Sequence, residues 1–363
     1  MTARLRAWWT GAGTDVRALV VLLPIGLVAA VGLTIWLTTP SAPVTSRATP
    51  SPSAQASIPS PGQSPVQSPT ASAPPTPAPT EPPDELLGLD GRFTLLLLGS
   101  DYRPSNPGNR TDTIMIVSVL PADGSLSAVS IPRDTARFPL PNGTIYGDKV
   151  NGLYQRIADR LGRDAAGPEL GRAVGAALGV EIDAYAFIGL GGVVALIDAI
   201  GGVDVVLDKS VNDPYYWVNS HTRGVYFPAG RNHFDGARAL IFARTRKGDT
   251  DWDRAARQQQ LVLATMGRVL DRGTAKLPGL VEVGLRYVRT DLPLDEAAAV
   301  FRLLQAADIA GAKGVVLGPP TYARHIAGGT DYELKMDVVR ALVAKLFAPA
   351  PGSPITQTAS PAP

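Results

Sequence analysis

Arginines and aspartates crowd one stretch of this 363-residue chain, ALIFARTRKGDTDWDRAARQQQ, which covers residues 239–260. Its charged residues of these two types are Arg244, Arg246, Arg254, Arg257, Asp249, Asp251 and Asp253. Because the planar guanidinium group offers paired donors to phosphate oxygens, such a cluster suits the wall of a site for a multiply charged anion. The alternative is a solvated surface on which the aspartates pair with the arginines.

Two predicted elements direct these arginines toward one point. Residues 237–246 are predicted as a strand, in which alternate side chains share a face. That face is expected to be apolar along most of its length and cationic at its end, with Leu240, Phe242, Arg244 and Arg246. In the helix predicted to follow, a second face carries Arg254, Arg257 and Gln258 at positions i, i+3 and i+4. We therefore expect a pocket that is apolar inside and cationic at its mouth.

Two carboxylates are predicted at the ends of neighbouring strands. Asp101 directly follows the apolar run RFTLLLLGS, and Asp112 begins the run DTIMIVSVL. Adjacent strands can bring both to one rim, where they suit Mg²⁺, which takes one or two carboxylates together with phosphate oxygens. Arg103 and Arg110 flank this pair. The alternative is a loop held by turns between aspartate side chains and the backbone.

Charged residues also end two later segments. SIPRDT places Arg133 and Asp134 at the end of another predicted strand, and DKVNGLY contributes Lys149 and Asn151. For Lys149 the alternative is an isolated, solvated lysine on a loop.

The order of the predicted elements indicates the fold class. Strands are predicted over residues 92–101, 112–121 and 126–134, as a meander that begins a sheet, and the first run is apolar enough to be buried on both faces. Helices and strands then alternate, with helices at 167–180, 191–202, 253–272, 294–308 and 332–347 and strands at 183–190 and 203–208. This alternation predicts an α/β fold with a mixed central β-sheet flanked by helices on both faces.

The segments outside this domain predict a membrane-anchored protein. Residues 18–38 form an apolar run long enough for a transmembrane helix, whereas a cleaved signal peptide has a shorter apolar core. Arginines before the span place residues 1–17 in the cytoplasm by the positive-inside rule. Residues 39–85, rich in Pro, Ser, Thr and Ala, and the tail 349–363 are predicted to be disordered, which leaves residues 86–348 as an extracytoplasmic domain.

Composition excludes several classes of function. The chain has no cysteine and only three histidines, so thiolate chemistry is excluded and no zinc-binding pattern is present. A net charge of +2 and the absence of any base-reading module argue against nucleic-acid binding.

Several segments together resemble the LytR-CpsA-Psr family of membrane-anchored cell-wall proteins. In chain order they are LLLLGSDYR, RTDTIMIVSV, SIPRD, KVNGLY, IDAIGGVDV, FDGARALIFARTR and DTDWDRAARQQ. The resemblance implies a mixed sheet whose helices enclose a lipid-binding cavity. It also implies a phosphotransferase that uses Mg²⁺ to move a glycopolymer from a polyprenyl diphosphate carrier onto a cell-wall polysaccharide, such as peptidoglycan, through a phosphodiester. The implied partners are this lipid-linked donor, the wall acceptor and the membrane.

The same resemblance assigns roles to the residues above. Asp101 and Asp112 are expected to hold the metal, and Asp101 is the candidate to accept the proton of the attacking hydroxyl. Arg133, Arg244 and Arg246 are expected to stabilise the charge of the reacting phosphate. The resemblance places Arg110, Arg133, Arg244, Arg246, Arg254 and Gln258 around the diphosphate. Arg257 in the same helix motif and Lys149 of DKVNGLY complete the expected set of donors.

Two alternatives use the same site: a polyprenyl diphosphate phosphatase, which transfers the phosphate to water, and a non-catalytic scaffold that binds the lipid-linked polymer. One departure from the family is the compact loop KGDTDWD between Arg246 and Arg254, where relatives often have a longer, glycine-containing loop. It leaves open which aspartate pairs with the arginines.

Overall fold

The computed structural model describes residues 86–88, 90–101, 109–246, 250–273, 277–293, 296–327 and 329–348. All of them belong to one compact unit, Pro82–Pro363. The cytoplasmic segment 1–17, the membrane span 18–38, the linker 39–85 and the tail 349–363 lie outside the described residues and stay predictions. Within the described ranges, no helix is both long and apolar enough to cross a bilayer.

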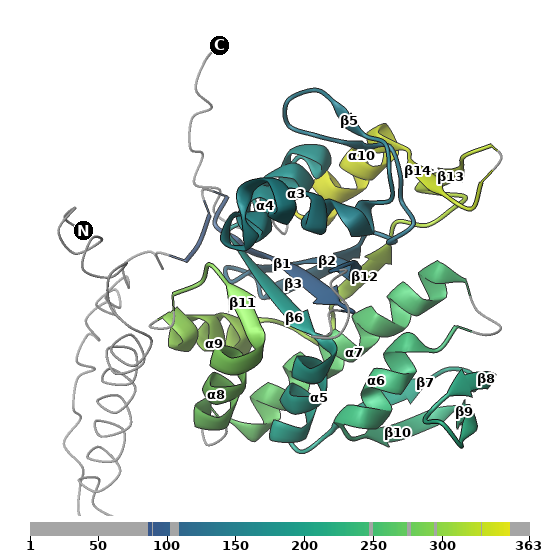
Figure 1. The fold of residues 1–363 in the computed structure, drawn as a ribbon. Coiled ribbons are helices and arrows are strands. Elements are labelled where there is room, and N and C mark those ends of the chain that lie inside the picture. Colours follow the sequence, from purple (N-terminus) through teal and green to yellow (C-terminus); the bar gives the residue numbers. More distant parts are fainter. Residues whose placement is uncertain are drawn as a thin grey trace, which may run out of the picture. The chain divides into compact units, whose positions relative to one another are not determined.

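A six-stranded mixed sheet forms the centre of the domain (Figure 1). Its strand order is β11-β6-β1-β2-β3-β12, in which the pairs β1–β6 and β3–β12 are parallel and the others antiparallel. The strands are β1 (Phe93–Ser100), β2 (Thr111–Leu120), β3 (Ser125–Ser130), β6 (Ala184–Gly189), β11 (Val288–Thr290) and β12 (Lys313–Val316). The antiparallel run β1-β2-β3 confirms the predicted meander.

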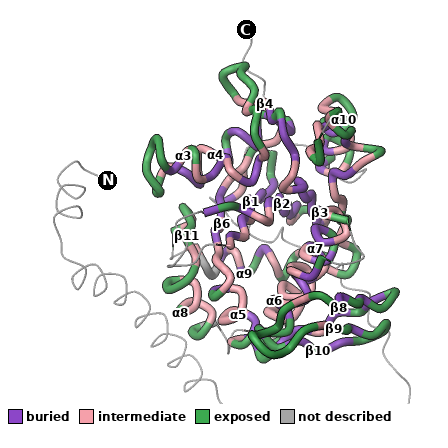
Figure 2. The backbone as a smooth tube through the Cα atoms, turned by 45° about the vertical axis from the view of Figure 1, so that its right-hand side comes forward, coloured by how far each residue is buried: buried purple, intermediate pink, exposed green. Residues whose placement is uncertain are grey.

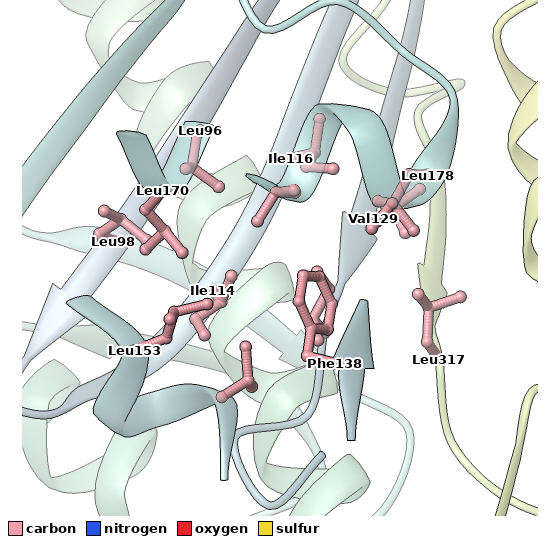
Figure 3. Close-up of a cluster of buried hydrophobic side chains, with 14 of the residues drawn as sticks. Leu96, Leu98, Ile114, Ile116, Val129, Phe138, Leu153, Leu170, Leu178 and Leu317 are labelled. Atoms are coloured by element: carbon pink, nitrogen blue, oxygen red, sulfur yellow. The ribbon is translucent and has the colours of Figure 1, made fainter. Parts of the chain in front are cut away.

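One face of the sheet packs against three helices. These are α3 (Leu153–Leu161), which follows the short 3₁₀ helix η1 (Val150–Gly152), α4 (Arg163–Leu178) and α10 (Met336–Leu346). Because strand side chains alternate between faces, every second residue of β1 and β2 enters this core. Figure 3 shows Leu96 and Leu98 of β1 and Ile114 of β2 beside Leu170 of α4.

The other side of the sheet holds the remaining helices (Figure 1). They are α5 (Leu190–Ala199), α6 (Gly236–Arg244), α7 (Asp251–Arg272), α8 (Leu277–Tyr287) and α9 (Ala297–Ala306). Met115 and Val117, which alternate with the residues of the first core, pack toward Val262 and Met266 of α7. Helices therefore lie on both sides of a mixed sheet, as predicted.

A second core lies around three phenylalanines. Phe227, Phe234 and Phe242 contact one another with ring centroids 5.1 to 5.3 Å apart. The first two belong to two-stranded sheets, in which β7 (Val203–Leu207) pairs with β10 (Gly230–Phe234) and β8 (Val211–Trp217) with β9 (Arg223–Phe227). The strand predicted at 203–208 thus forms outside the central sheet. Two further hairpins are β4 (Phe138–Pro139) with β5 (Ile145–Tyr146), and β13 (Ala323–His325) with β14 (Tyr332–Leu334).

The prediction of a strand over residues 237–246 is wrong, because Gly236–Arg244 form helix α6. Asp235 caps this helix, and its Oδ1 accepts a hydrogen bond of 2.8 Å from the backbone N–H of Arg238. A short apolar run cannot be assigned to strand or helix by its periodicity alone. A smaller correction concerns residues 332–347, where Tyr332–Leu334 form β14 and the helix begins only at Met336.

Candidate functional site

A cavity of about 1500 Å³ lies between the sheet and the helices α5, α6, α7 and α9. The sheet contributes Leu95 and Leu97, which alternate with the core residues Leu96 and Leu98. The helices contribute further apolar side chains, among them Leu196, Leu240, Leu261, Met266 and Leu303. The run of leucines in β1 is therefore covered on both faces, by a packed core on one and by this cavity on the other. Such a space suits an apolar ligand.

Charged side chains line one part of this cavity. We call the following set the charged mouth: Asp101, Arg110, Asp112, Arg133, Asp134, Lys149, Arg244, Arg246 and Arg254. Asp148, Asp213 and Asp331 line the same cavity. Arg110 and Arg246 are exposed, so this part of the cavity is open to solvent. An apolar pocket with arginines at its mouth is present, but aspartates line the same cavity in equal number to the cationic side chains, so the expected net positive charge of the mouth is not found.

An irregularity in the pairing of β1 and β2 aims Asp112 into the cavity. Gly99 pairs with Thr113 but Ser100 pairs with Thr111, so Asp112 is the extra residue of a bulge. Asp112 and Thr113 consequently both line the cavity, although neighbours in a regular strand face opposite sides. The backbone N–H of Asp101 donates to the carbonyl of Arg110 at 3.3 Å, which brings the two predicted carboxylates to the same rim.

The carboxylate of Asp101 is incompletely satisfied. Its Oδ1 is buried and has no hydrogen-bond partner among the described residues. A buried acceptor in this state is costly, typically by about 1–3 kcal/mol. The position therefore suits a cation that is not part of the chain.

The two carboxylates fit a magnesium ion only together with a phosphorylated ligand. Oδ1 of Asp112 accepts a hydrogen bond of 3.0 Å from Arg133, which leaves Oδ2 as the oxygen that would bind a metal ion. In the part of the chain that the structure describes, no three acidic or histidine side chains gather to hold a metal by themselves. Since Mg²⁺ takes one or two carboxylates and completes its shell with phosphate and water oxygens, the donor set suits this ion.

Asp251 links two arginines of the charged mouth. Its Oδ1 lies 3.4 Å from Nε of Arg133 and also pairs with Arg254, one turn further along α7. The side chain of Asp251 is only 11% exposed and that of Arg254 only 6%, so this is not a solvated surface pair. Asp253 instead forms a capping box with Thr250 at the start of α7. Among the described aspartates of residues 250–253, the one that pairs with these arginines is therefore Asp251.

Burial sets the protonation equilibria of this cluster. It raises the pKa of Asp251, and the positive charges of Arg254 and Arg133 offset only part of that effect. Burial also lowers the pKa of Arg254, against the attraction of Asp251. For Arg133 the burial effect is outweighed by Asp112, Asp251 and Asp134, so its pKa is raised. Guanidinium groups stay protonated throughout, so Arg133 and Arg254 remain available as cationic donors.

A carboxylate distant in sequence holds the loop of Arg244 and Arg246. Oδ2 of the buried Asp213 accepts hydrogen bonds from Oγ1 of Thr245 at 2.7 Å and from the backbone N–H of Arg246 at 3.0 Å. Asp213 belongs to β8 and stands 32 residues before Thr245. No local pattern could have identified it, because the contact depends on the fold.

Lys149 is held by two carboxylates. Its Nζ lies 2.7 Å from Asp134 and 3.1 Å from Asp331. The hydrogen bond to Asp134 is the main cause that raises the pKa of Lys149. The alternative of an isolated lysine is therefore wrong, and Asp331 is a neighbour of the charged mouth that the sequence did not reveal.

The structure separates the three residues predicted to share one face of α7. Arg254 and Gln258 line the cavity, but Arg257 does not. The buried Arg257 donates to the carbonyl of Thr245 at 2.6 Å, and its guanidinium lies 5.9 Å from the ring centroid of Phe242. Arg257 thus stabilises the backbone between Arg244 and Arg246 from the side that faces away from the cavity. Arg103 and Asp249 lie outside the described residues.

Fold and site together define an α/β protein with a large, mostly apolar cavity beside its central sheet and with arginines and aspartates at the opening of that cavity. The sequence profile of the LytR_cpsA_psr family matches residues 71–320. The chain therefore belongs to the LytR_cpsA_psr family, and the resemblance found in its motifs is confirmed.

Two relatives, one from Corynebacterium and one from Bacillus, are named for roles in cell-wall synthesis. The chain is 35% identical to the cell wall biosynthesis protein LcpA of Corynebacterium glutamicum, over 56% of this chain and 45% of that protein. It is 32% identical to the polyisoprenyl-teichoic acid–peptidoglycan teichoic acid transferase TagU of Bacillus mycoides, over 56% of this chain and 61% of that protein. Either match spans less than two thirds of the relative's length.

Solved structures share the fold. The crystal structure of Bacillus subtilis TagV superposes with a TM-score of 0.55 at 24% identity, and it covers 71% of this chain and 98% of that one. A structure of TagT bound to LIIa-WTA gives a TM-score of 0.54 at 21% identity, with 70% and 89% of the two chains covered. At these identities the likeness shows the fold alone.

Proposed function

We propose that this protein is a membrane-anchored phosphotransferase that moves a glycopolymer from a polyprenyl diphosphate carrier onto a cell-wall polysaccharide such as peptidoglycan. The observation that carries the proposal is the joining of two environments in one cavity. An apolar space of about 1500 Å³ suits a prenyl chain, and the arginines at its mouth suit a diphosphate. Family membership and the names of the relatives support the same activity.

The proposed reaction needs an in-line displacement at phosphorus. A hydroxyl oxygen of the wall glycan attacks the phosphorus that carries the glycopolymer and forms the new phosphodiester bond. The bond from this phosphorus to the bridging oxygen of the diphosphate breaks, and polyprenyl phosphate leaves with that oxygen. The hydroxyl proton passes to the carboxylate of Asp101 at the rim of the cavity.

The chain's own residues orient and neutralise the donor. Arg133, Arg244 and Arg246 donate hydrogen bonds to oxygens of the diphosphate and stabilise the charge that grows on the leaving group. The apolar cavity holds the prenyl chain and so fixes the phosphorus for attack. Asp101 and Asp112 would hold Mg²⁺, which would supply further neutralisation of the phosphate oxygens.

The anchor belongs to the same proposal. The apolar segment 18–38 places the domain on the outer side of the cell membrane, where both the lipid-linked donor and the wall acceptor occur. The linker 39–85 gives the domain reach between the bilayer and the wall.

The experiment combines the full-length protein with a prenyl diphosphate that carries a radiolabelled oligosaccharide and with a wall-glycan fragment, with and without Mg²⁺. We expect metal-dependent label on the glycan. Arg244→Ala should lower the rate about 100-fold or more, because it removes a donor to the reacting phosphate. Asp101→Ala should put no label on the glycan, either with or without Mg²⁺. Arg172→Ala is the matched control, since this arginine is 71% exposed on α4, on the other face of the sheet.

The outcomes separate the candidate functions. Labelled sugar phosphate released only into water identifies a phosphatase. Tight donor binding without turnover under any condition, unchanged by Asp101→Ala, identifies a scaffold. Either result contradicts the proposed transfer.

A further inference from the structure

Three aromatic residues stand at the edge of the charged mouth. Tyr215, Tyr216 and Trp217 of β8 line the same cavity as Arg244 and Arg246. Tyr215 is 53% exposed and Trp217 60% exposed. We call these three residues the aromatic edge. Figure 2 shows that β8 and its partner β9 lie at the outside of the domain.

The strand geometry and one arginine present these rings to the cavity. The pairing of β8 with β9 is regular from Val211 to Asp213 and then irregular until Trp217. This irregularity allows three consecutive side chains to line one cavity, which the alternation of a regular strand forbids. Arg223 of β9 lies 4.9 Å from the ring centroid of Tyr215 and 5.3 Å from that of Trp217, so its guanidinium holds both rings while more than half of each residue stays exposed.

Asp213 fixes the aromatic edge relative to the charged mouth. Its Oδ1 accepts a hydrogen bond of 3.0 Å from the backbone N–H of Tyr215. Its Oδ2 accepts from Thr245 and from the backbone N–H of Arg246. One buried carboxylate thus ties the start of the aromatic edge to the loop of the anion-binding arginines.

We propose that the aromatic edge binds the first sugar rings of the donor, so that it selects the glycan next to the diphosphate. This inference rests on the proposed function. With the prenyl chain in the apolar cavity and the diphosphate at the arginines, the sugar on the second phosphate has to leave through the mouth, past these rings. A pyranose ring presents a face of C–H groups that packs on an aromatic ring, and its hydroxyl oxygens accept hydrogen bonds from a guanidinium such as that of Arg223.

A membrane surface is the other partner that exposed Trp and Tyr side chains suggest. The turn between β8 and β9 argues against it. Apart from Val218, the turn is polar, with Asn219, Ser220, His221 and Thr222, and Asn219 accepts hydrogen bonds from the backbone N–H groups of the last two. A segment that inserts into a membrane carries apolar side chains at the position where this turn is polar.

The test measures the affinity of the full-length protein for two soluble probes, geranyl diphosphate and geranyl-diphosphoryl chitobiose, by titration calorimetry. Trp217→Ala should weaken binding of the chitobiose probe about 10-fold, the loss of one well-packed aromatic contact, and should leave binding of geranyl diphosphate within about 2-fold. Tyr226→Ala is the matched control, because Tyr226 is 56% exposed in the same hairpin but does not line the cavity. It should bind both probes as the parent protein does.

The outcomes distinguish this inference from the proposed function. Arg244→Ala should weaken both probes, and if geranyl diphosphate binds to it unchanged, the proposed anion site is wrong and the inference falls with it. If Arg244→Ala weakens both probes but Trp217→Ala weakens neither, only the inference is overturned. A Trp217→Ala protein that loses cosedimentation with anionic phospholipid vesicles, yet keeps its affinity for chitobiose, assigns the aromatic edge to the membrane and also overturns it.

Discussion

At the scale of the residue, Asp251 explains how three like charges can be held together without a ligand. It is almost fully buried and faces Arg133 and Arg254, while Arg246 contributes a further positive charge nearby. Buried charges are tolerated only when they are paired, so this carboxylate keeps the arginines in place in the free protein. A phosphate ligand would face the same guanidinium groups.

Replacement of Asp251 should therefore change the response to ligand more than it changes the stability of the free protein. Asp251→Asn keeps the shape but removes the charge. We expect the unfolding free energy of the free protein to change by no more than about 1 kcal/mol, because the burial that raises the pKa of Asp251 offsets the attraction of Arg254 and Arg133. The rise in melting temperature on adding geranyl diphosphate should be larger than in the parent, because the ligand then supplies the missing negative charge. Thermal unfolding with and without the ligand measures both effects.

The control for this prediction is Asp253→Asn, in the same helical turn. Asp253 forms the capping box of α7 with the N-cap residue Thr250, and the ion pairs of Arg133 and Arg254 in this turn are with Asp251. The unfolding free energy of Asp253→Asn should fall by at most about 1 kcal/mol, because the capping box is weakened. Its rise in melting temperature on adding geranyl diphosphate should equal that of the parent. An equal ligand response in Asp251→Asn and the parent would contradict the role given to Asp251.

At the scale of the element, helix α6 decides where the arginines lie. Leu240 and Arg244 are four residues apart and share the face that lines the cavity, whereas Phe242 turns into the second core. The helix lies close to α5 because Gly236 has no side chain: a Cβ there would overlap the carbonyl oxygen of Val194. Asp198 of α5 completes the contact, since it accepts a hydrogen bond of 2.7 Å from the backbone N–H of Gly236.

Gly236→Ala should accordingly push α6 away from α5. We expect it to destabilise the protein by about 1–3 kcal/mol, as overpacking does, and to weaken binding of geranyl diphosphate because Arg244 moves with the helix. Gly284→Ala in α8 is the matched control, since its added Cβ meets no atom within 4 Å. It should gain about 0.5–1 kcal/mol from helix propensity alone. Chemical denaturation distinguishes the two, and equal stability of both variants would rule out the close approach.

At the scale of the whole molecule, the fold combines a packed core and an open cavity on the two faces of one sheet. The side of α3, α4 and α10 is filled, while the side of α5, α6, α7 and α9 is hollow. The stability of the domain therefore depends strongly on the filled side and on the chain that leads into it. Asp183 lies there, between α4 and β6, and its Oδ2 accepts a hydrogen bond of 2.7 Å from the backbone N–H of Thr94 in β1.

The pKa of Asp183 gives the stability of the whole domain a pH dependence. Burial raises this pKa from 3.8 to about 6, so the native state binds the proton more tightly than the unfolded state. The contribution of Asp183 to stability is therefore present below pH 4, falls as the pH rises from about 4 to about 6, and is lost above that range.

Asp183→Asn keeps an acceptor for Thr94 and removes this titration. At pH 7 we expect the unfolding free energy of the variant to exceed that of the parent by about 1 kcal/mol, after allowance for solvent screening of a partly exposed group. The fall in unfolding free energy between pH 4 and 6 should become shallower in the variant. Denaturation curves across this pH range measure it, with Asp159→Asn on the exposed surface of α3 as control. A parallel pH profile for Asp183→Asn and the parent would contradict the prediction.

The sequence by itself determined the fold class, the meander β1-β2-β3 and most of the charged mouth. Long apolar runs and turn residues are local signals, and the charged residues that end these runs necessarily gather at the edges of the sheet. Asp101, Asp112 and Arg133 could therefore be predicted. Arg244, Arg246 and Arg254 were predicted to line the same pocket, but partly from a strand that is in fact helix α6. The short run at 237–246 could not be assigned, because its helix depends on packing against α5.

Only the tertiary structure decided which residues surround and support the site. Asp213, Asp331 and the aromatic edge come from segments whose local pattern is that of ordinary strands and loops, and their contacts span many residues of chain. Likewise, the spacing of Arg257 resembles that of Arg254 and Gln258, yet Arg257 points to the carbonyl of Thr245 and not to the cavity. Periodicity gives the face of a helix, but only the packing of that helix determines which side chains on the face reach the ligand.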